Sequence, residues 1–159
     1  MRKLVEFINE IAGIMYVGGI LSHIVIGIVL GHPDASTAFH VYQYKLASAY
    51  ILILPGLGLK IAADLILYFG FGVRANWLKV KAVMMAFLTI NAFVFLVPMM
   101  PEMLQLAEES LPTGHVSEAF IARGLTEQMI GMSNVIPLLA ELVLGSFRPK
   151  LFGERRKAA

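Results

Sequence analysis

The chain has 159 residues, of which 58% are hydrophobic and only 15% are charged. A soluble domain usually carries about 25% charged residues, so this composition points to lipid as the surrounding solvent. The formal net charge of +2 is too small to indicate a nucleic-acid partner, and no such partner is expected. Because the chain has no cysteine, disulfides and thiolate metal sites are excluded.

Four apolar segments are long enough to cross a bilayer, which needs about 20 residues of helix. They cover residues 8–30, 46–69, 77–97 and 127–147. Because backbone in lipid must satisfy its own hydrogen bonds, each is expected to be a helix, the third ending at Pro98. The sequence therefore predicts an all-α, four-transmembrane-helix up-down bundle, a single integral membrane domain over residues 1–159. We expect loops at 31–45 and 99–125, with Ser117 capping a short interfacial helix at 116–122.

Lysine and arginine are concentrated in three of the five non-spanning segments. The start of the chain carries Arg2 and Lys3. The turn between the second and third spans carries Arg74, and the start of the third span carries Lys79 and Lys81. The tail carries Arg148, Lys150, Arg155, Arg156 and Lys157. The other two connections carry only Lys45 and Arg123, beside several glutamates. Basic residues favour the cytoplasmic side of a membrane. The pattern predicts a bacterial inner (plasma) membrane protein with both termini in the cytoplasm.

Ionisable residues inside the spans are costly in lipid and usually face a partner or a cavity. The sequence predicts one intramembrane polar cluster, made by Glu10, Lys60, Asp64, Glu141 and Asn134, with Lys81 at a similar depth. Three interpretations stay open. The cluster can be an ion-pair network that fixes helix register, or a pocket or path for a ligand or a proton. Its shallow members can also extend their side chains to the headgroups.

The first span carries Asn9, Tyr16 and His23 at intervals of seven residues, which places them on one helix face. His23 is a candidate ligand for haem or a metal, or a hydrogen-bonded core histidine. A G-x-x-x-G at Gly27 and Gly31 is expected to let another helix approach closely. In the second span, Pro55 removes a helix hydrogen bond and is expected to produce a kink.

Histidines and methionines gather in and near the two long connections. His32, His40, His115, Met99 and Met100 form a candidate metal site. Imidazole with thioether suits copper, and imidazole with a carboxylate suits zinc. Their spacing matches no closed metal motif, and exposed loop residues are the alternative interpretation.

Four short motifs carry a family resemblance. They are Tyr-Val-Gly-Gly at 16–19, Leu-Pro-Gly at 54–56, Trp-Leu-Lys-Val-Lys at 77–81 and Phe-Arg-Pro-Lys-Leu at 147–151. With the overall layout they resemble an uncharacterised family of small bacterial four-helix integral membrane proteins. That family is distantly similar to CopD-like copper-resistance proteins and to HemJ-like protoporphyrinogen oxidases.

The HemJ-like proteins bind haem b with a histidine early in the first helix and a lysine near the start of the third. The resemblance carries that lysine onto Lys81, so haem b is a possible cofactor, and copper or zinc is less expected. The histidine position falls near Asn9, which cannot serve as that ligand. His23 lies on the same face, about 21 Å farther along the helix, so separate sites are expected for His23 and Lys81.

The sequence contains none of the common nucleotide-binding, metalloprotease or c-type haem motifs, and whether the protein is an enzyme stays open. We expect a polar intramembrane pocket that binds or passes a small molecule or ion. The alternatives are a haem-binding redox protein of HemJ-like type and a structural or accessory membrane subunit. Because a single bundle encloses little space, a homodimer or a larger membrane complex is expected.

Overall fold

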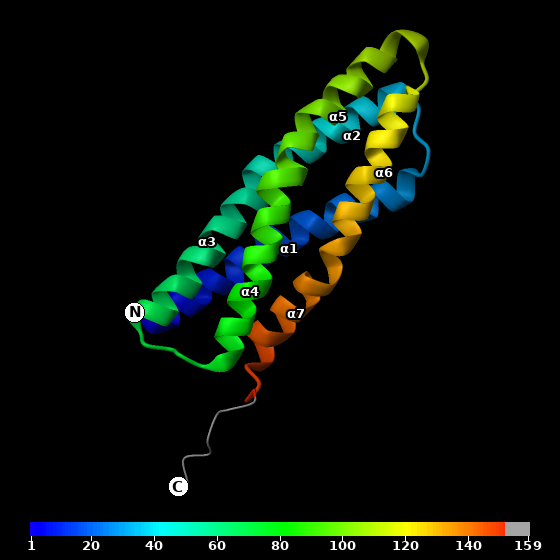
Figure 1. Ribbon diagram of the computed structural model, residues 1–159. Helices are drawn as coiled ribbons and strands as arrows, with labels where there is room; N and C mark the ends of the chain where they lie inside the picture. The colour runs from blue at the N-terminus through cyan, green and yellow to red at the C-terminus, as the bar shows by residue number, and fades with distance from the viewer. Residues whose placement is uncertain (152–159) are drawn as a thin grey trace, which may run out of the picture.

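The computed structural model describes residues 1–151 and is helical between short connections (Figure 1). The α-helices are α1 (Arg2–Leu30), α2 (Ala35–Ser48), α3 (Leu54–Leu65), α4 (Asn76–Ile90), α5 (Val97–Ser110), α6 (Glu118–Ser133) and α7 (Val135–Phe147). Three π-helical segments, η1 (Ala49–Ile53), η2 (Ile66–Gly70) and η3 (Asn91–Leu96), and the 3₁₀ turn η4 (Leu111–Thr113) join or extend them. The described residues thus form four long helical segments.

These four segments confirm the predicted all-α bundle, since each is apolar and long enough to cross a membrane. They run over Arg2–Val29, Ala35–Gly70, Asn76–Thr113 and Glu118–Phe147. The expected loops at 31–45 and 99–125 are wrong, because α2 begins at Ala35 and helix continues to Thr113. The two middle segments, of 36 and 38 residues, are about 54 and 57 Å long, well beyond the hydrocarbon core.

The caps and prolines explain where these helices begin and bend. Ser117 caps a helix as predicted, by accepting from the backbone N–H of Phe120, but that helix continues to Ser133. Pro98 does not end the third segment, and Pro55 lies within the second. A π-helical segment precedes each of these two prolines, and its wider turn gives the ring room without ending the helix.

Three helix pairs hold the bundle together: α1 packs along α3, α4 along α7, and α2 along α5. The backbones of α1 and α3 approach closely at Gly56 on α3, where an added Cβ would lie 2.8 Å from the backbone N of Tyr16 on α1. The predicted close packing at Gly27 and Gly31 is absent from the described chain, since an added Cβ there meets nothing within 4 Å. Helix α1 instead approaches its partner at Gly19 and opposite Gly56.

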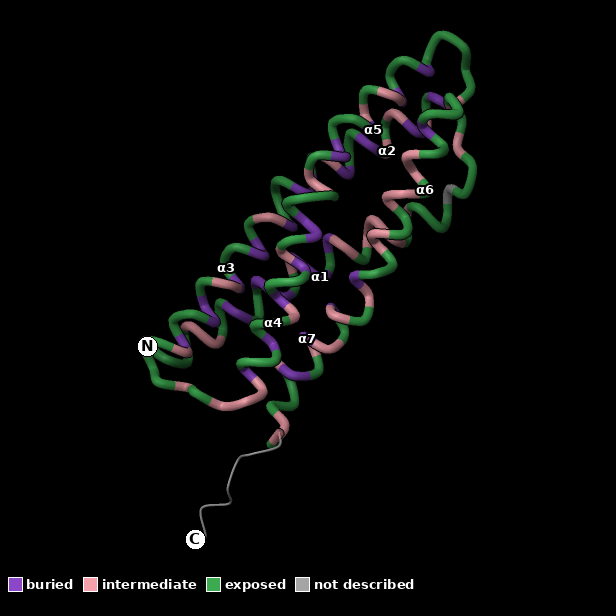
Figure 2. Tube along the Cα trace, viewed as in Figure 1, coloured by how far each residue is buried: buried purple, intermediate pink, exposed green. Residues whose placement is uncertain are grey.

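Two apolar cores stabilise the two halves of the molecule, and buried residues follow the inner faces of the helices (Figure 2). The first core joins α1, η1, α3, α4 and α7 around Tyr16, Leu57 and Leu88. The second core joins α2, α5 and α6 around Tyr42 and Met103. Beyond this second core lies the end that we call the distal end, where the backbone N–H of Ala35 donates to the carbonyl of Gly114 (3.3 Å).

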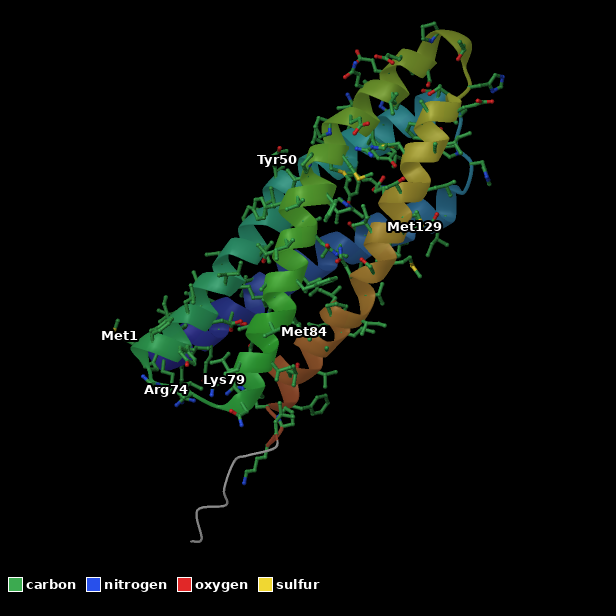
Figure 3. All side chains as sticks on the ribbon, in the orientation of Figure 1. Met1, Tyr50, Arg74, Lys79, Met84 and Met129 are labelled. Carbon is green, nitrogen blue, oxygen red and sulfur yellow. The ribbon has the colours of Figure 1, made fainter. Side chains whose placement is uncertain are left out.

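The opposite end, which we call the terminal end, carries Met1 and the end of α7 (Figure 1). Arg74 and Lys79 lie there too, whereas Tyr50 and Met129 lie farther toward the distal end (Figure 3). Large apolar side chains such as Ile28, Phe69 and Ile136 are exposed on the outer helix surfaces. A protein that exposes so many apolar side chains on long helices is built for lipid, so this chain is a membrane protein. The predicted basic tail residues Arg155, Arg156 and Lys157 lie outside the described residues.

Candidate functional site

Four helices bring five polar side chains together in the terminal half of the bundle. We call Asn9, Lys60, Asp64, Lys81 and Glu141 the inner charge cluster; they come from α1, α3, α3, α4 and α7. All five are buried, and the side chain of Glu141 is 0% exposed. Buried charges at such depth are stable only when they face one another, so the cluster fixes how the four helices sit together.

Lys81 is the centre of the inner charge cluster. Its Nζ lies 2.8 Å from Oδ1 of Asp64 and 3.4 Å from Oε1 of Glu141, and it donates to Oδ1 of Asn9 at 3.4 Å. Lys60 Nζ lies 3.1 Å from the same Glu141 oxygen and donates to Asn9 Oδ1 at 3.2 Å. The Asn9 amide completes the ring by donating to Asp64 Oδ1. Two ammonium groups thus oppose two carboxylates.

The carboxylates nevertheless keep free hydrogen-bonding capacity. Oδ2 of Asp64 and Oε2 of Glu141 are buried and accept no hydrogen bond from any described residue. Both lysines are within ion-pair distance of Glu141 Oε1 but lie outside hydrogen-bond geometry with it. A buried acceptor without a donor costs about 1–3 kcal/mol. The cluster is therefore balanced in charge but short of donors.

Local sequence places these side chains. Lys60 and Asp64 are four residues apart on α3, so they project from one face. Gly13 on α1 leaves room for the Lys60 ammonium, since an added Cβ would lie 3.2 Å from Nζ. Gly145 on α7 does the same for Lys81, with an added Cβ 3.9 Å from Nζ. Because neither glycine carries a side chain, the helix surfaces beside both lysines leave room for the ammonium groups.

A pocket of about 480 Å³ opens onto the inner charge cluster. All five cluster residues line it. Apolar walls come from Ile14, Val17, Leu67 and Leu142. A pocket of this size that is apolar around a few converging polar groups is the usual form of a small-molecule site.

Polar and aromatic side chains surround the terminal end of this pocket. Arg148 Nη1 lies 3.4 Å from Glu6 Oε1, and Arg2 Nε lies 3.1 Å from the same oxygen. The Arg148 guanidinium lies 5.8 Å from the centre of the Trp77 ring, in cation–π contact. These side chains lie where a membrane–water interface is expected, and Glu6, Trp77 and Arg148 line the pocket at that end.

The structure changes the membership of the predicted intramembrane cluster. Lys60, Asp64 and Glu141 come together as expected, and Lys81 joins them. Glu10 does not join: it is exposed at the pocket edge, and Asn9 takes the inner position because one residue is about 100° around a helix. Asn134 is also elsewhere, accepting from Nδ2 of Asn91 at 2.7 Å. The interval of seven from Asn9 to Tyr16 and His23 was the signal that could have identified Asn9.

A second buried polar group, the distal polar site, consists of Tyr42, Lys45 and Glu127. Lys45 Nζ lies 2.9 Å from Glu127 Oε1, and the Tyr42 hydroxyl donates to the other Glu127 oxygen. The Lys45 ammonium also lies 4.6 Å from the Tyr42 ring centre. Sequence reasoning missed this site because Lys45 was assigned to the loop at 31–45 and Glu127 to the start of the fourth span. Glu127, Asn134 and Glu141 follow one another at intervals of seven, which is a signal that could have found it.

The two haem-ligand candidates lie in different environments. Lys81 belongs to the inner charge cluster, whereas His23 contacts the Ser48 hydroxyl and faces the Tyr44 ring at 6.2 Å. His23 is 14 residues beyond the cluster residue Asn9 on α1, about 21 Å along the helix. The structure therefore does not bring His23 and Lys81 together.

The five metal candidates do not converge either. His32 and His115 are exposed, and His40 Nδ1 lies 3.3 Å from Gln43 Oε1. Met99 and Met100 are buried on α5. Among residues 1–151, no three histidine, aspartate or glutamate side chains gather in a way that could hold a metal ion.

Comparison with known proteins leaves this site to be interpreted from its own chemistry. No protein family, curated protein or solved structure matches the chain.

Proposed function

We propose that the protein binds a small molecule or ion that donates hydrogen bonds, in the pocket of the inner charge cluster. One observation carries the proposal: four buried charges lie against a pocket of about 480 Å³, and three of their carboxylate oxygens accept no hydrogen bond from the described residues. A ligand that supplies N–H or O–H groups would satisfy these acceptors as the carboxylates turn toward it. Ammonium and hydroxyl groups are the chemistry that fits.

The charge of the whole pocket supports the same class of ligand. Four carboxylates line it, from Glu6, Glu10, Asp64 and Glu141, against three basic groups, from Lys60, Lys81 and Arg148. Arg2 pairs with Glu6 from outside the lining, so the negative excess rests on the exposed carboxylate of Glu10, which favours a cation. An anionic ligand would meet the carboxylates without a spare lysine, because Lys81 already faces three oxygen atoms.

A purely structural ion-pair network is the competing explanation. Such a network stabilises best when every member is satisfied, since a partly satisfied buried network is costly. The three carboxylate oxygens that accept no hydrogen bond from the described residues, together with the open pocket, favour binding over a structural role alone. The network also holds the four helices together, so both roles can coexist in the same residues.

The proposal includes the location of the protein. We place it in a bacterial inner membrane with the terminal end in the cytoplasm, since Arg74 and Lys79 lie at that end and Arg2 and Arg148 stand at the start of α1 and the end of α7. The pocket would then lie in the cytoplasmic half of the bilayer. Tagging each terminus and testing its accessibility to protease in sealed inverted vesicles checks this orientation.

Calorimetry in lipid nanodiscs tests the binding proposal with two ammonium probes, ethanolamine and dodecylamine. The heat of mixing with empty nanodiscs is subtracted, because dodecylamine also partitions into lipid. We expect saturable binding of at least one probe, retained in Glu127→Gln, which removes a carboxylate of the distal polar site. If neither probe gives saturable heat above empty nanodiscs, the binding proposal is wrong.

Passage of an ion or solute is a second candidate function. It is favoured by Glu127, Asn134 and Glu141, which follow one another at intervals of seven residues. These positions are about 10 Å apart along α6 and α7, so polar groups recur through the depth of the bundle. Proton or solute flux in liposomes, measured for wild type, Lys60→Met and Glu141→Gln, tests this candidate. Equal flux in all three chains excludes passage through the inner charge cluster.

A further inference from the structure

We infer that the ligand is amphipathic and enters the pocket sideways from the bilayer, through the gap between α1 and α7. Its head would face the inner charge cluster, and its apolar tail would lie in the gap. This inference rests on the proposed function and adds the class of ligand and its route.

The gap exists because of how the helices pair. Helix α1 packs along α3, and α7 packs along α4, whereas α1 and α7 make little direct contact with each other over their described lengths. Their facing residues nevertheless line one pocket: Gly13, Ile14 and Gly18 from α1, and Leu142 and Gly145 from α7. Small residues on both walls keep the gap open.

The gap reaches the depth of the acyl chains. Ile14 lines the pocket and is also 70% exposed on the outer surface, so the pocket wall and the lipid-facing surface meet there. Ile14 is 12 residues beyond Arg2, about 18 Å along α1, which is near the middle of a core about 30 Å thick. A route that opens at this depth admits a molecule already dissolved in lipid.

The aqueous route is more obstructed. At the terminal end, Arg148 contacts both Glu6 and the Trp77 ring, and all three side chains line the pocket. Farther along α1, Gly18 is exposed, and an added Cβ there would meet nothing within 4 Å. The gap is therefore the less hindered way to the cluster.

The lining itself is divided as an amphipathic molecule requires. The charged and amide groups of the inner charge cluster converge on one another, and Ile14, Val17, Leu67 and Leu142 supply apolar surface beside them. An alkyl tail removes this apolar surface from water or from loosely packed lipid, while the head supplies the missing donors. A ligand that is polar throughout would leave the apolar part of the lining without a complementary surface.

A second hollow of about 600 Å³ offers a different route and so a control. It lies between α3 and α4, is almost wholly apolar, and reaches Asp64 at its inner side. Ala86 is exposed and lines it. A bulky side chain at Ala86 would narrow this groove without touching the gap between α1 and α7.

The test uses fluorescence of Trp77, which lines the pocket and is the single tryptophan of the chain. Wild type, Gly18→Phe, Gly27→Phe and Ala86→Phe are placed in nanodiscs and titrated with dodecylamine and with ethanolamine. Gly27→Phe is the matched control: like Gly18, Gly27 is an exposed α1 glycine with nothing within 4 Å of an added Cβ, but it does not line the pocket.

We expect dodecylamine to change Trp77 emission saturably, with the apparent Kd raised at least tenfold in Gly18→Phe and less than twofold in Gly27→Phe and Ala86→Phe. Ethanolamine should bind far more weakly in all four chains. Equal affinity of Gly18→Phe and Gly27→Phe, or a loss confined to Ala86→Phe, overturns the placement of the tail in the gap and, with it, the inferred route. Tight binding of ethanolamine alone overturns the amphipathic class but supports the proposed function, whereas no binding of either probe overturns both.

Discussion

The Nζ of Lys60 on α3 lies 3.1 Å from Oε1 of Glu141 on α7, and neither side chain is appreciably exposed. Removing one partner of such a pair leaves an uncompensated buried charge. We therefore expect Lys60→Met and Glu141→Gln each to lower the free energy of unfolding by about 3 kcal/mol. Unfolding by a denaturing detergent, followed by circular dichroism, measures the change.

The double variant Lys60→Met/Glu141→Gln is informative, because it removes both charges. Its loss of unfolding free energy should be smaller than the sum of the losses in the two single variants. Lys79→Met is the matched control, since Lys79 is an exposed lysine close to the cluster residue Lys81 on α4. Additive single losses, or an equal loss in Lys79→Met, would contradict the pairing.

Gly56→Ala should separate α1 from α3. The added Cβ would lie 2.8 Å from the backbone N of Tyr16 and 3.0 Å from the carbonyl O of Ala12, and backbone cannot give way cheaply. A cost of about 1–3 kcal/mol follows from such overpacking. Gly58→Ala, two residues on, meets nothing within 4 Å and should be neutral or slightly stabilising. Thermal unfolding of the two variants, measured side by side, checks this close approach of α1 and α3. Equal unfolding midpoints would show that the two helices do not meet at Gly56.

Tyr42→Phe should destabilise the distal polar site. The Tyr42 hydroxyl donates to the partly buried carboxylate of Glu127, and a hydrogen bond to a charged group contributes about 1.5–3 kcal/mol. Tyr44→Phe removes a hydroxyl that donates to Ser22 at 3.1 Å on the exposed surface, so its effect should be much smaller. Chemical unfolding of both variants provides the comparison, and a larger loss in Tyr44→Phe would argue against a buried distal site.

Asp34 should make the start of α2 sensitive to acid. The backbone N–H of Thr37 donates to its carboxylate at 2.7 Å, and this hydrogen bond lowers the pKa of Asp34 below its ordinary value of 3.8. Because the folded-state pKa is depressed, the stabilisation is fully present above 3.8 and is lost as the pH falls through the lowered pKa.

Hydrogen exchange of the amides at the start of α2 measures this effect. Exchange should accelerate in acid relative to its intrinsic rate, and Asp34→Asn should abolish that pH dependence, because asparagine caps a helix without titrating. An unchanged acid profile in Asp34→Asn would show that another group is responsible.

Hydropathy predicts the four spans well but not the full helices. The cores of the spans are continuous apolar runs, which is the strongest signal in a membrane sequence. The extensions α2 and α5 contain many polar residues and resemble loops on a hydropathy scale. Their apolar residues nevertheless recur at helical spacing, as Ala38 and Tyr42 do on α2 and Met103 and Ala107 on α5. Those extensions are stabilised by packing on each other, which a single-helix criterion does not detect.

The candidate site shows a similar division. That Lys60, Asp64 and Glu141 would lie together follows from their depth in the spans, because buried charges need partners. Depth does not say which way a side chain points, and for this reason Glu10 was predicted where Asn9 lies. The pocket and its opening between α1 and α7 depend on helix pairing, which the sequence pattern does not determine.

The affinity of the pocket for dodecylamine, with and without the Glu141 charge, tests the central claim most directly. Trp77 emission in nanodiscs is titrated for wild type and for Glu141→Gln, after circular dichroism shows that the variant is folded. The account predicts an apparent Kd at least tenfold higher in the variant, equivalent to about 1.4 kcal/mol of lost binding free energy. Equal affinity in the two folded chains would contradict it, because the inner charge cluster would then hold the helices together without holding a ligand.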